Sequence, residues 1–307
     1  MSWVVVKGQD LISIKDLSKE DIEYIFKRTL EMEKLLVKRS KLLDDKIIAT
    51  LFFESSTRTR MSFQSAALHL GARVIGTDSA EASSMLKGET LSDTIKMVNK
   101  YADLIVIRHP SDGSARLAAE VAEKPVINAG DGANQHPSQT ILDLYTILKK
   151  KGRISKLNVY LVGDLKHARA MRSLLYGLGM FNSNVVLVAP KGLEMEKQVV
   201  EEVKDKFSIN IEQTNNLNLK ECDVLYVCRI QKERFVDPYE AAKVQKEFRI
   251  TEDDLKNAKD DLIILHPLPK IDEIDPSVDK SKFAAYFEQA GYGVPVRMAI
   301  IASILGR

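Results

Sequence analysis

The sequence predicts an α/β protein of two domains, each with a mainly parallel β-sheet flanked by helices. Short apolar runs rich in β-branched residues alternate with helical patterns of about ten to fifteen residues, which is typical of parallel sheets. The alternation stops at a basic stretch around Gly152 and then starts again. A chain of 307 residues is long enough for two such units. We therefore expect a first domain at residues 1–150 and a second at 151–287.

The first half is expected to contain four strands and several helices. Ser18 opens the first helix in the manner of a capping box, and Gly71 ends the second. The expected strands cover residues 47–53, 72–76, 103–108 and 125–129. The expected helices cover residues 18–36, 111–122 and 140–150, a segment that follows the turn at 55–60 and ends at Gly71, and a segment that begins at Thr90 or Ser92 and ends at Tyr101.

The second half repeats this pattern. Its expected strands cover residues 157–162, 184–189, 209–211, 223–228 and 262–265, and its expected helices cover 169–180 and 194–206. The charged stretch 229–249 is expected to form a loop with a short helix. Residues 294–305 are apolar on nearly every side, so this terminal helix should be buried. We expect helix 288–307 to pack back on the first domain.

Composition narrows the class of protein. The 45 Lys and Arg residues nearly balance the 43 Asp and Glu residues, which gives no reason to expect nucleic acid or a membrane as a partner. Cys222 and Cys228 lie too far apart on one expected strand to form a disulfide, which favours reduced core residues. No apolar run approaches the roughly 18 residues of a membrane span, and no signal-peptide pattern is visible. We expect a cytoplasmic protein.

Hydroxyl and arginine side chains are concentrated in the turn between strand 47–53 and the next helix. Ser56, Thr57 and Thr59 supply hydroxyl donors, and Arg58 and Arg60 supply guanidinium groups that suit phosphate or carboxylate oxygens. A helix N-terminus adds unpaired N–H groups and a partial positive charge. The alternative is an ordinary serine cap beside two solvated arginines. So many consecutive donors behind a buried strand favour a phosphate site.

Two more groups follow strands of the first half. Right-handed crossovers place the carboxyl ends of parallel strands along one edge, where open α/β sheets bind ligands. Arg108 ends one strand, and His136 and Gln139 begin the helix after another. Arg108 could equally be a surface arginine, and a lone histidine is more often structural. The spacing of His136 and Gln139 nevertheless offers two hydrogen-bonding groups to one ligand.

The second half offers a separate set of anion-binding side chains. Gly163 follows a strand, but the surrounding residues lack the glycine pattern of a dinucleotide site, and the chain has no P-loop. Arg169 lies one helical turn further on, and Arg229 and Gln231 point to one side after strand 223–228. No metal-ligand spacing is present, so we expect neither a metal nor a cofactor. The residues indicate two anionic ligands, one per domain, without identifying a reaction.

These motifs together resemble the transcarbamoylase family over essentially the whole chain. The stretch 53–63 is similar to the family's carbamoyl-phosphate signature, and 136–139 (HPSQ) to its second motif. Residues 266–269 (HPLP) resemble the aspartate-specific members, since ornithine transcarbamoylases typically carry Cys where Pro267 stands. Further similarities lie at residues 87–90 (KGET), 162–165 (VGDL) and 229–234 (RIQKER).

The resemblance implies a role for each matching residue. The phosphate of carbamoyl phosphate would be held by Ser56, Thr57, Arg58 and Thr59. Its carbonyl oxygen would be surrounded by Arg58, Arg108 and His136, and its amide by Gln139 and the backbone of Leu268 and Pro269. The aspartate carboxylates would be held by Arg169, Arg229 and Gln231. Ser83 and Lys87 would enter from an adjacent chain. The catalytic groups would be Arg58, Lys87, Arg108 and His136.

The resemblance also implies an activity and an assembly. A carbamoyl group would pass from carbamoyl phosphate to L-aspartate without a cofactor, in a cleft between the domains, as part of pyrimidine synthesis. Members form homotrimers with shared active sites, which often pair with a zinc-binding regulatory chain in an allosteric holoenzyme. Ala170 stands where Thr is frequent, and Lys270 where Arg is frequent. The alternatives are a transcarbamoylase for another amine, a non-catalytic protein that binds phosphate compounds and, more distantly, a dehydrogenase.

Overall fold

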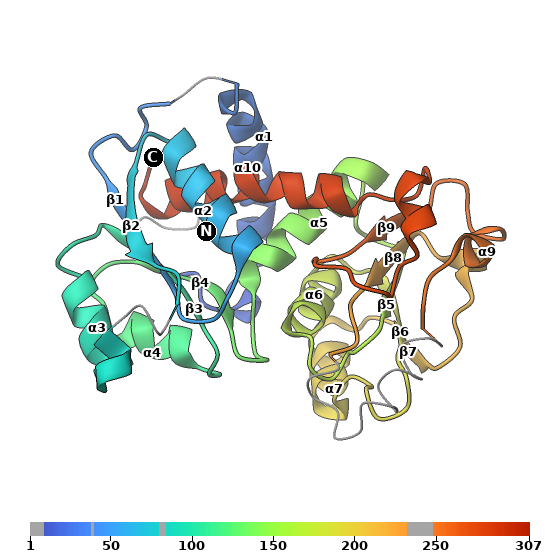
Figure 1. Ribbon diagram of the computed structural model, residues 1–307. Helices are drawn as coiled ribbons and strands as arrows, with labels where there is room; N and C mark the ends of the chain where they lie inside the picture. The colour runs from blue at the N-terminus through green and yellow to red at the C-terminus, as the bar shows by residue number, and fades with distance from the viewer. Residues whose placement is uncertain (1–8, 38–39, 80–83, 232–247) are drawn as a thin grey trace. The chain divides into compact units, whose positions relative to one another are not determined.

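The computed structural model describes residues 9–37, 40–79, 84–231 and 248–307 (Figure 1). The chain divides into two compact units, one made of Met1–Tyr145 and Tyr292–Arg307 and the other of Thr146–Gly291. The divisions fall within two long helices, α5 (Pro137–Lys151) and α10 (Tyr286–Ile304). The last part of α10 therefore belongs with the first unit.

The first unit is built on a parallel four-stranded sheet in the order β2-β1-β3-β4. Its strands are β1 (Ile47–Phe52), β2 (Arg73–Thr77), β3 (Leu104–His109) and β4 (Val126–Asp131). Its further helices are α1 (Lys19–Leu35), α2 (Thr57–His69), α3 (Leu91–Val98) and α4 (Ser114–Val121), with 3-10 turns η1 (Ile14–Asp16) and η2 (Ser84–Lys87). The order reverses direction between β1 and β3, which is where open α/β sheets bind ligands.

Helices cover the first sheet on both faces (Figure 1). On one face, Ile95 of α3 and Ala118 of α4 pack into a buried apolar cluster with Leu51 and Ile107. On the other face, the Gln64 amide of α2 donates to the Thr50 hydroxyl over 3.1 Å. Successive side chains of each strand point to opposite faces of the sheet, and both faces are therefore packed under helices, as parallel sheets require.

The second unit contains a parallel five-stranded sheet in the order β7-β6-β5-β8-β9. Its strands are β5 (Asn158–Val162), β6 (Asn184–Val188), β7 (Ile211–Thr214), β8 (Val224–Val227) and β9 (Ile263–Leu265). Its helices are α6 (Arg169–Met180), α7 (Lys197–Phe207) and α9 (Glu252–Leu255), with 3-10 turns η3 (Leu219–Glu221) and η5 (Pro276–Lys280). Here the order reverses direction between β5 and β8.

The expected fold class is confirmed, but several helices and strands begin at other residues than expected. The α5 helix begins at Pro137 rather than at residue 140, because the fixed φ of proline suits a first helical position. The β7 strand begins at Ile211, where the expectation was 209–211. Ser18 forms the expected capping box, and Gly71 follows α2 with a φ of +90°.

The remaining expectations concern buried segments and one loop. Cys222 and Cys228 are free and buried, as expected. Most side chains of the last turns of α10 are buried, also as expected. The charged loop expected at 229–249 falls largely on 232–247, outside the described residues. None of the helices in the described ranges is long and apolar enough to cross a membrane.

Candidate functional site

Three predicted groups of the first unit meet at the carboxyl edge of its sheet. Phe52 at the end of β1 pairs in register with Arg108 of β3. His109, the next residue of β3, pairs with Asp131 at the end of β4. The turn into α2 follows β1, Arg108 lies near the end of β3, and the segment before α5 follows β4, so the three groups come from adjacent strands. The sequence predicted this convergence from the crossover rule alone.

The first turn of α2 has the features of an anion site. Ser56 occupies the N-cap position with extended backbone, but its hydroxyl forms no capping hydrogen bond with the described residues of the helix. Thr57 and Arg58 are exposed, whereas Thr59 is buried. An ordinary serine cap would use its hydroxyl on the N–H groups of the first turn. These N–H groups instead remain available to an outside acceptor, which supports the phosphate interpretation.

The two arginines of the turn differ in their surroundings. The Nη1 atom of Arg60 lies 2.7 Å from the Oδ2 atom of Asp78, so this guanidinium is committed to an internal ion pair. Partial desolvation lowers the pKa of Arg58 from its ordinary value. Arg58 forms no ion pair with a described residue. It is therefore the stronger candidate for binding an anion at the helix start.

Glu54 positions the Arg108 side chain. The Nε atom of Arg108 donates to the Oε2 atom of Glu54 over 3.1 Å, and the Arg108 side chain is only 13% exposed. This bond orients the guanidinium plane at the carboxyl end of β3. Sequence reasoning did not assign Glu54 to the site, although the residue lies directly beside the hydroxyl-rich turn and could have been found there.

His136 and Gln139 flank the first turn of α5. His136 is 5% exposed, and its Nδ1 atom lies 3.5 Å from the Ser138 hydroxyl. The Gln139 amide nitrogen donates to the Oδ1 atom of Asp143 over 2.8 Å. Asp143, one helical turn further on, was also absent from the predicted site. Its spacing of four residues from Gln139 was the available signal.

The second unit brings its predicted residues to the ends of β5 and β8, which are adjacent strands. Arg169 is the first residue of α6, and Arg229 and Gln231 follow β8. The Oδ2 atom of buried Asp164 accepts a 3.4 Å hydrogen bond from the Gln231 backbone N–H, which joins the two segments. These side chains therefore lie at the point where the strand order reverses, as ligand sites in such sheets do.

Close backbone approach explains the single glycine after β5. Gly163 has a φ of +121°, and a Cβ atom there would lie 2.2 Å from the Cys228 carbonyl oxygen. Only glycine fits this contact without strain. The residue thus serves the packing of two strand ends.

Leu268 and Pro269 follow β9 in a tightly held turn. Leu268 has a φ of +55° and is joined to Pro269 by a cis peptide bond. The Leu268 N–H donates to the Nδ1 atom of His266 over 2.8 Å. The Nζ atom of Lys270 lies 3.0 Å from Asp279 and is committed to that carboxylate.

Two predicted residues belong to the stretch before α3. Lys87 is the last residue of η2 and is exposed. Ser83 lies outside the described residues, as do Lys232, Glu233 and Arg234 of the motif after β8.

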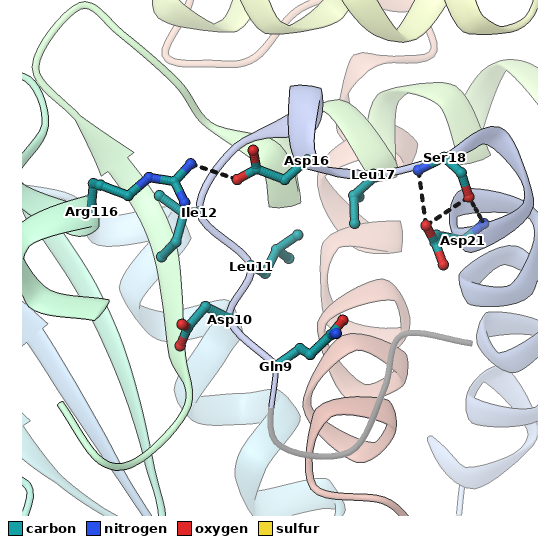
Figure 2. A pocket seen from close by; sticks show the side chains of 9 residues that line it. All are labelled: Gln9, Asp10, Leu11, Ile12, Asp16, Leu17, Ser18, Asp21 and Arg116. Atoms are coloured by element: carbon teal, nitrogen blue, oxygen red, sulfur yellow. Dashed lines mark hydrogen bonds and ion pairs between the residues drawn. The ribbon is translucent and has the colours of Figure 1, made fainter. Parts of the chain in front are cut away.

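A pocket of about 520 Å³ lies elsewhere in the first unit (Figure 2). Asp10 on its wall accepts from the Val126 N–H at the amino end of β4, the opposite edge from the site above. Asp16 pairs with Arg116, and Asp21 with Ser18 (Figure 2). None of the predicted site residues lines this pocket.

The two sets of residues suit different acids. The first unit combines a helix N-terminus, hydroxyls, two arginines and a histidine, which together fit a phosphate carrying a carbonyl group. The second unit offers two arginines and an amide for carboxylates. In the described part of the chain, no three His, Cys, Asp or Glu side chains are grouped in a way that could hold a metal ion.

Known proteins match both halves of the chain. Residues 9–149 match the family described as aspartate/ornithine carbamoyltransferase, carbamoyl-P binding domain. Residues 155–304 match the family described as aspartate/ornithine carbamoyltransferase, Asp/Orn binding domain. The aspartate carbamoyltransferase catalytic subunit of Thermococcus onnurineus is 52% identical over 310 residues, covering 100% of this chain and 99% of the relative.

Solved structures show the same similarity. The catalytic subunit of M. jannaschii aspartate transcarbamoylase has a TM-score of 0.91 at 47% identity, covering 97% of this chain and 98% of the other. Aspartate transcarbamoylase from Trypanosoma cruzi in complex with carbamoyl phosphate and aspartate has a TM-score of 0.92 at 36% identity. That match covers 98% of this chain and 96% of the other.

Proposed function

Because the chain belongs to the aspartate/ornithine carbamoyltransferase family, we propose that it transfers the carbamoyl group of carbamoyl phosphate to L-aspartate. The products are N-carbamoyl-L-aspartate, a precursor in pyrimidine synthesis, and inorganic phosphate. The observation that carries this proposal is the convergence of the α2 turn, Arg108 and His136 at the ends of adjacent strands of one sheet.

The start of α2 binds the phosphate of carbamoyl phosphate. Ser56, Thr57 and Thr59 contribute hydroxyls, the uncapped backbone contributes N–H groups, and Arg58 contributes positive charge. The unused Ser56 hydroxyl and the absence of a described ion pair at Arg58 support this role. Arg60 is not assigned to the phosphate, because its guanidinium is paired with Asp78.

Arg58, Arg108 and His136 stabilise the reacting carbonyl. The neutral α-amine of aspartate attacks the carbamoyl carbon and forms a C–N bond, while the carbonyl electrons move onto oxygen. The electrons return as the C–O bond to phosphate breaks, and the amine gives up a proton, which the departing phosphate accepts. Removing one positioned donor from such a centre typically costs about 3 kcal/mol of transition-state stabilisation. Gln139 and the backbone of Leu268 and Pro269 bind the carbamoyl amide.

The second unit binds aspartate. The carboxylates of aspartate are held by Arg169, Arg229 and Gln231. The α-amine is then free to attack the carbamoyl carbon. The hydrogen bond that the Gln231 backbone N–H donates to Asp164 supports this arrangement, because it fixes one of the two strand-end segments against the other. We assign residues 1–150 with helix 288–307 to carbamoyl phosphate binding, and residues 151–287 to aspartate binding.

The family resemblance extends the proposal to a homotrimer in which Ser83 and Lys87 of one chain serve the neighbouring chain. The exposure of Lys87 supports this part. So do Met61 and Leu68 of α2 and Ile75 of the edge strand β2, which are large apolar side chains 58%, 58% and 41% exposed. Relatives described as catalytic subunits are consistent with an additional zinc-binding regulatory chain in an allosteric holoenzyme.

A product assay tests the activity. The purified chain is incubated with carbamoyl phosphate and either aspartate or ornithine, and both carbamoylated product and phosphate are quantified. We expect N-carbamoyl-L-aspartate and phosphate in equal amounts, with no product from ornithine. Citrulline would assign the chain to the ornithine branch. Binding of carbamoyl phosphate without product from either amine would favour a non-catalytic phosphate-binding protein.

A further inference from the structure

The Gln139 amide is held in one orientation by a neighbour on its own helix. Its nitrogen donates to the Oδ1 atom of Asp143 over 2.8 Å, and the two residues are 9% and 0% exposed. An ionised carboxylate only accepts hydrogen bonds, whereas an amide carries a donor at one end and an acceptor at the other. The nitrogen of Gln139 must therefore face Asp143, and its oxygen must point the other way.

The amide oxygen is the atom of Gln139 that remains for a ligand. Within the described ranges, this oxygen accepts no hydrogen bond from another residue, while the nitrogen is already engaged. The NH₂ group of carbamoyl phosphate can only donate, so it needs an acceptor. A reversed Gln139 would present a second donor to this NH₂ group and would repel it.

A buried cation supports the ionised form of Asp143. Arg297 of α10 is 3% exposed, and its guanidinium lies over the ring of Phe63, 4.9 Å from the centroid. Burial lowers the pKa of Arg297 to about 10, and the charge of Asp143 opposes this decrease. Arg297 is thus protonated at neutral pH. The attraction is mutual, so the same positive charge favours the carboxylate that holds Gln139.

We propose that Asp143 is a positioning residue that makes Gln139 an obligate hydrogen-bond acceptor, and thereby gives the site its preference for a carbamoyl over an acetyl group. The proposal rests on the proposed function, because it assigns the partner of Gln139 as the carbamoyl amide. Arg297 supplies the counter-charge that keeps Asp143 an acceptor.

Two unreactive phosphonates test the proposal. Phosphonoacetamide carries the NH₂ group of carbamoyl phosphate, and 2-oxopropylphosphonate carries a methyl group in its place. Their dissociation constants are measured for the wild type and for Asp143→Asn, whose side chain can donate as well as accept. We expect the preference of the wild type for the amide to fall about tenfold in Asp143→Asn, the loss of roughly one hydrogen bond. Binding of the methyl analogue should stay within about twofold, because its contacts do not involve Gln139.

Thr140→Val is the matched control. Thr140 is buried one residue after Gln139, and in the described structure its hydroxyl has no hydrogen-bond partner. The isosteric change should leave the preference between the two analogues intact. If Asp143→Asn does not fold, a second measurement on the wild type still tests the proposal. In wild-type protein labelled with ¹⁵N-glutamine, the Gln139 side-chain amide protons should exchange slowly with solvent, both without ligand and with phosphonoacetamide bound.

The outcomes distinguish a failure of the proposed function from a failure of the role assigned to Asp143. A wild type that binds neither phosphonate and forms no carbamoyl-aspartate would overturn the proposed function itself. An active wild type whose amide preference persists unchanged in Asp143→Asn would overturn only the role of Asp143. Large changes in the chemical shifts of the Gln139 side-chain amide protons on binding phosphonoacetamide would also overturn the role of Asp143, because the amide nitrogen would then face the ligand.

Discussion

The Nε2 atom of His266 lies 2.8 Å from the Oε1 atom of Glu273, and both side chains are at most 2% exposed. The Nδ1 atom of the same ring accepts the Leu268 N–H, so the ring proton is carried on Nε2 and faces the carboxylate. Glu273 also accepts the backbone N–H groups of Ile271 and Asp272. One carboxylate thus closes the turn that presents Leu268 and Pro269.

Replacing Glu273 with glutamine should therefore destabilise the protein. The glutamine NH₂ group would face a histidine or backbone donor that the carboxylate now satisfies. We expect a loss of about 1–3 kcal/mol in the free energy of unfolding, the usual effect of leaving a buried donor without its charged acceptor. Urea denaturation measures it, with Glu212→Gln on the exposed part of β7 as the control. Equal stability of the two variants would contradict the role of Glu273.

The same carboxylate should contribute to acid sensitivity. Burial alone would raise the pKa of Glu273, but the hydrogen bond from His266 and those from backbone N–H groups together lower it below its ordinary value of 4.5. A lowered pKa in the folded state gives stability that is fully present above the unfolded pKa and is lost as pH falls through the folded value. Because glutamine does not titrate, the stability difference between wild type and Glu273→Gln should narrow below pH 4.5. Unfolding curves at stepwise lower pH check this, and a constant difference would refute it.

Sequence patterns predicted the sheets well because strand periodicity and crossover handedness are local or general properties. They placed Ser56, Arg108 and His136 at one sheet edge without any knowledge of contacts. They missed Glu54, Asp143 and Glu273 because an acidic side chain gives no pattern that separates a buried partner from a solvated one. Arg58 and Arg60 also looked equivalent, since the pairing of Arg60 with Asp78 depends on the loop after β2.

The difference between Arg58 and Arg60 makes a paired test. Arg58→Ala should lower kcat/KM for carbamoyl phosphate by about 10²–10³-fold, because the proposed function places this cation against both the phosphate and the developing oxyanion. Arg60→Ala removes only the ion pair with Asp78 and should change kcat/KM by less than about fivefold. Steady-state kinetics with circular dichroism of both variants measures this. Similar losses in the two variants would count against the assignment.

The aspartate side offers a second pair on one helix. Arg169→Ala should raise the KM for aspartate by at least about tenfold, since the proposed function gives Arg169 a charged contact to an aspartate carboxylate. Arg172 lies nearly one turn further along α6, where its Nη2 atom is 3.0 Å from Glu196. Arg172→Ala should leave the aspartate KM nearly unchanged. An Arg169→Ala enzyme with normal aspartate saturation would remove this residue from the proposed site.

Mixing two inactive variants tests whether neighbouring chains share a site. An Arg58→Ala chain and a Lys87→Ala chain are each expected to be nearly inactive, because in the proposed homotrimer every site of either variant would lack one cation. If Lys87 serves the neighbouring chain, a site between the two kinds of chain can contain both intact groups. Random assortment of an equal mixture gives roughly a quarter of such sites, so about that share of wild-type activity should return. Native mass spectrometry verifies subunit exchange, and unmixed samples are the control. Exchange without recovery would show that Lys87 acts within its own chain or outside the site.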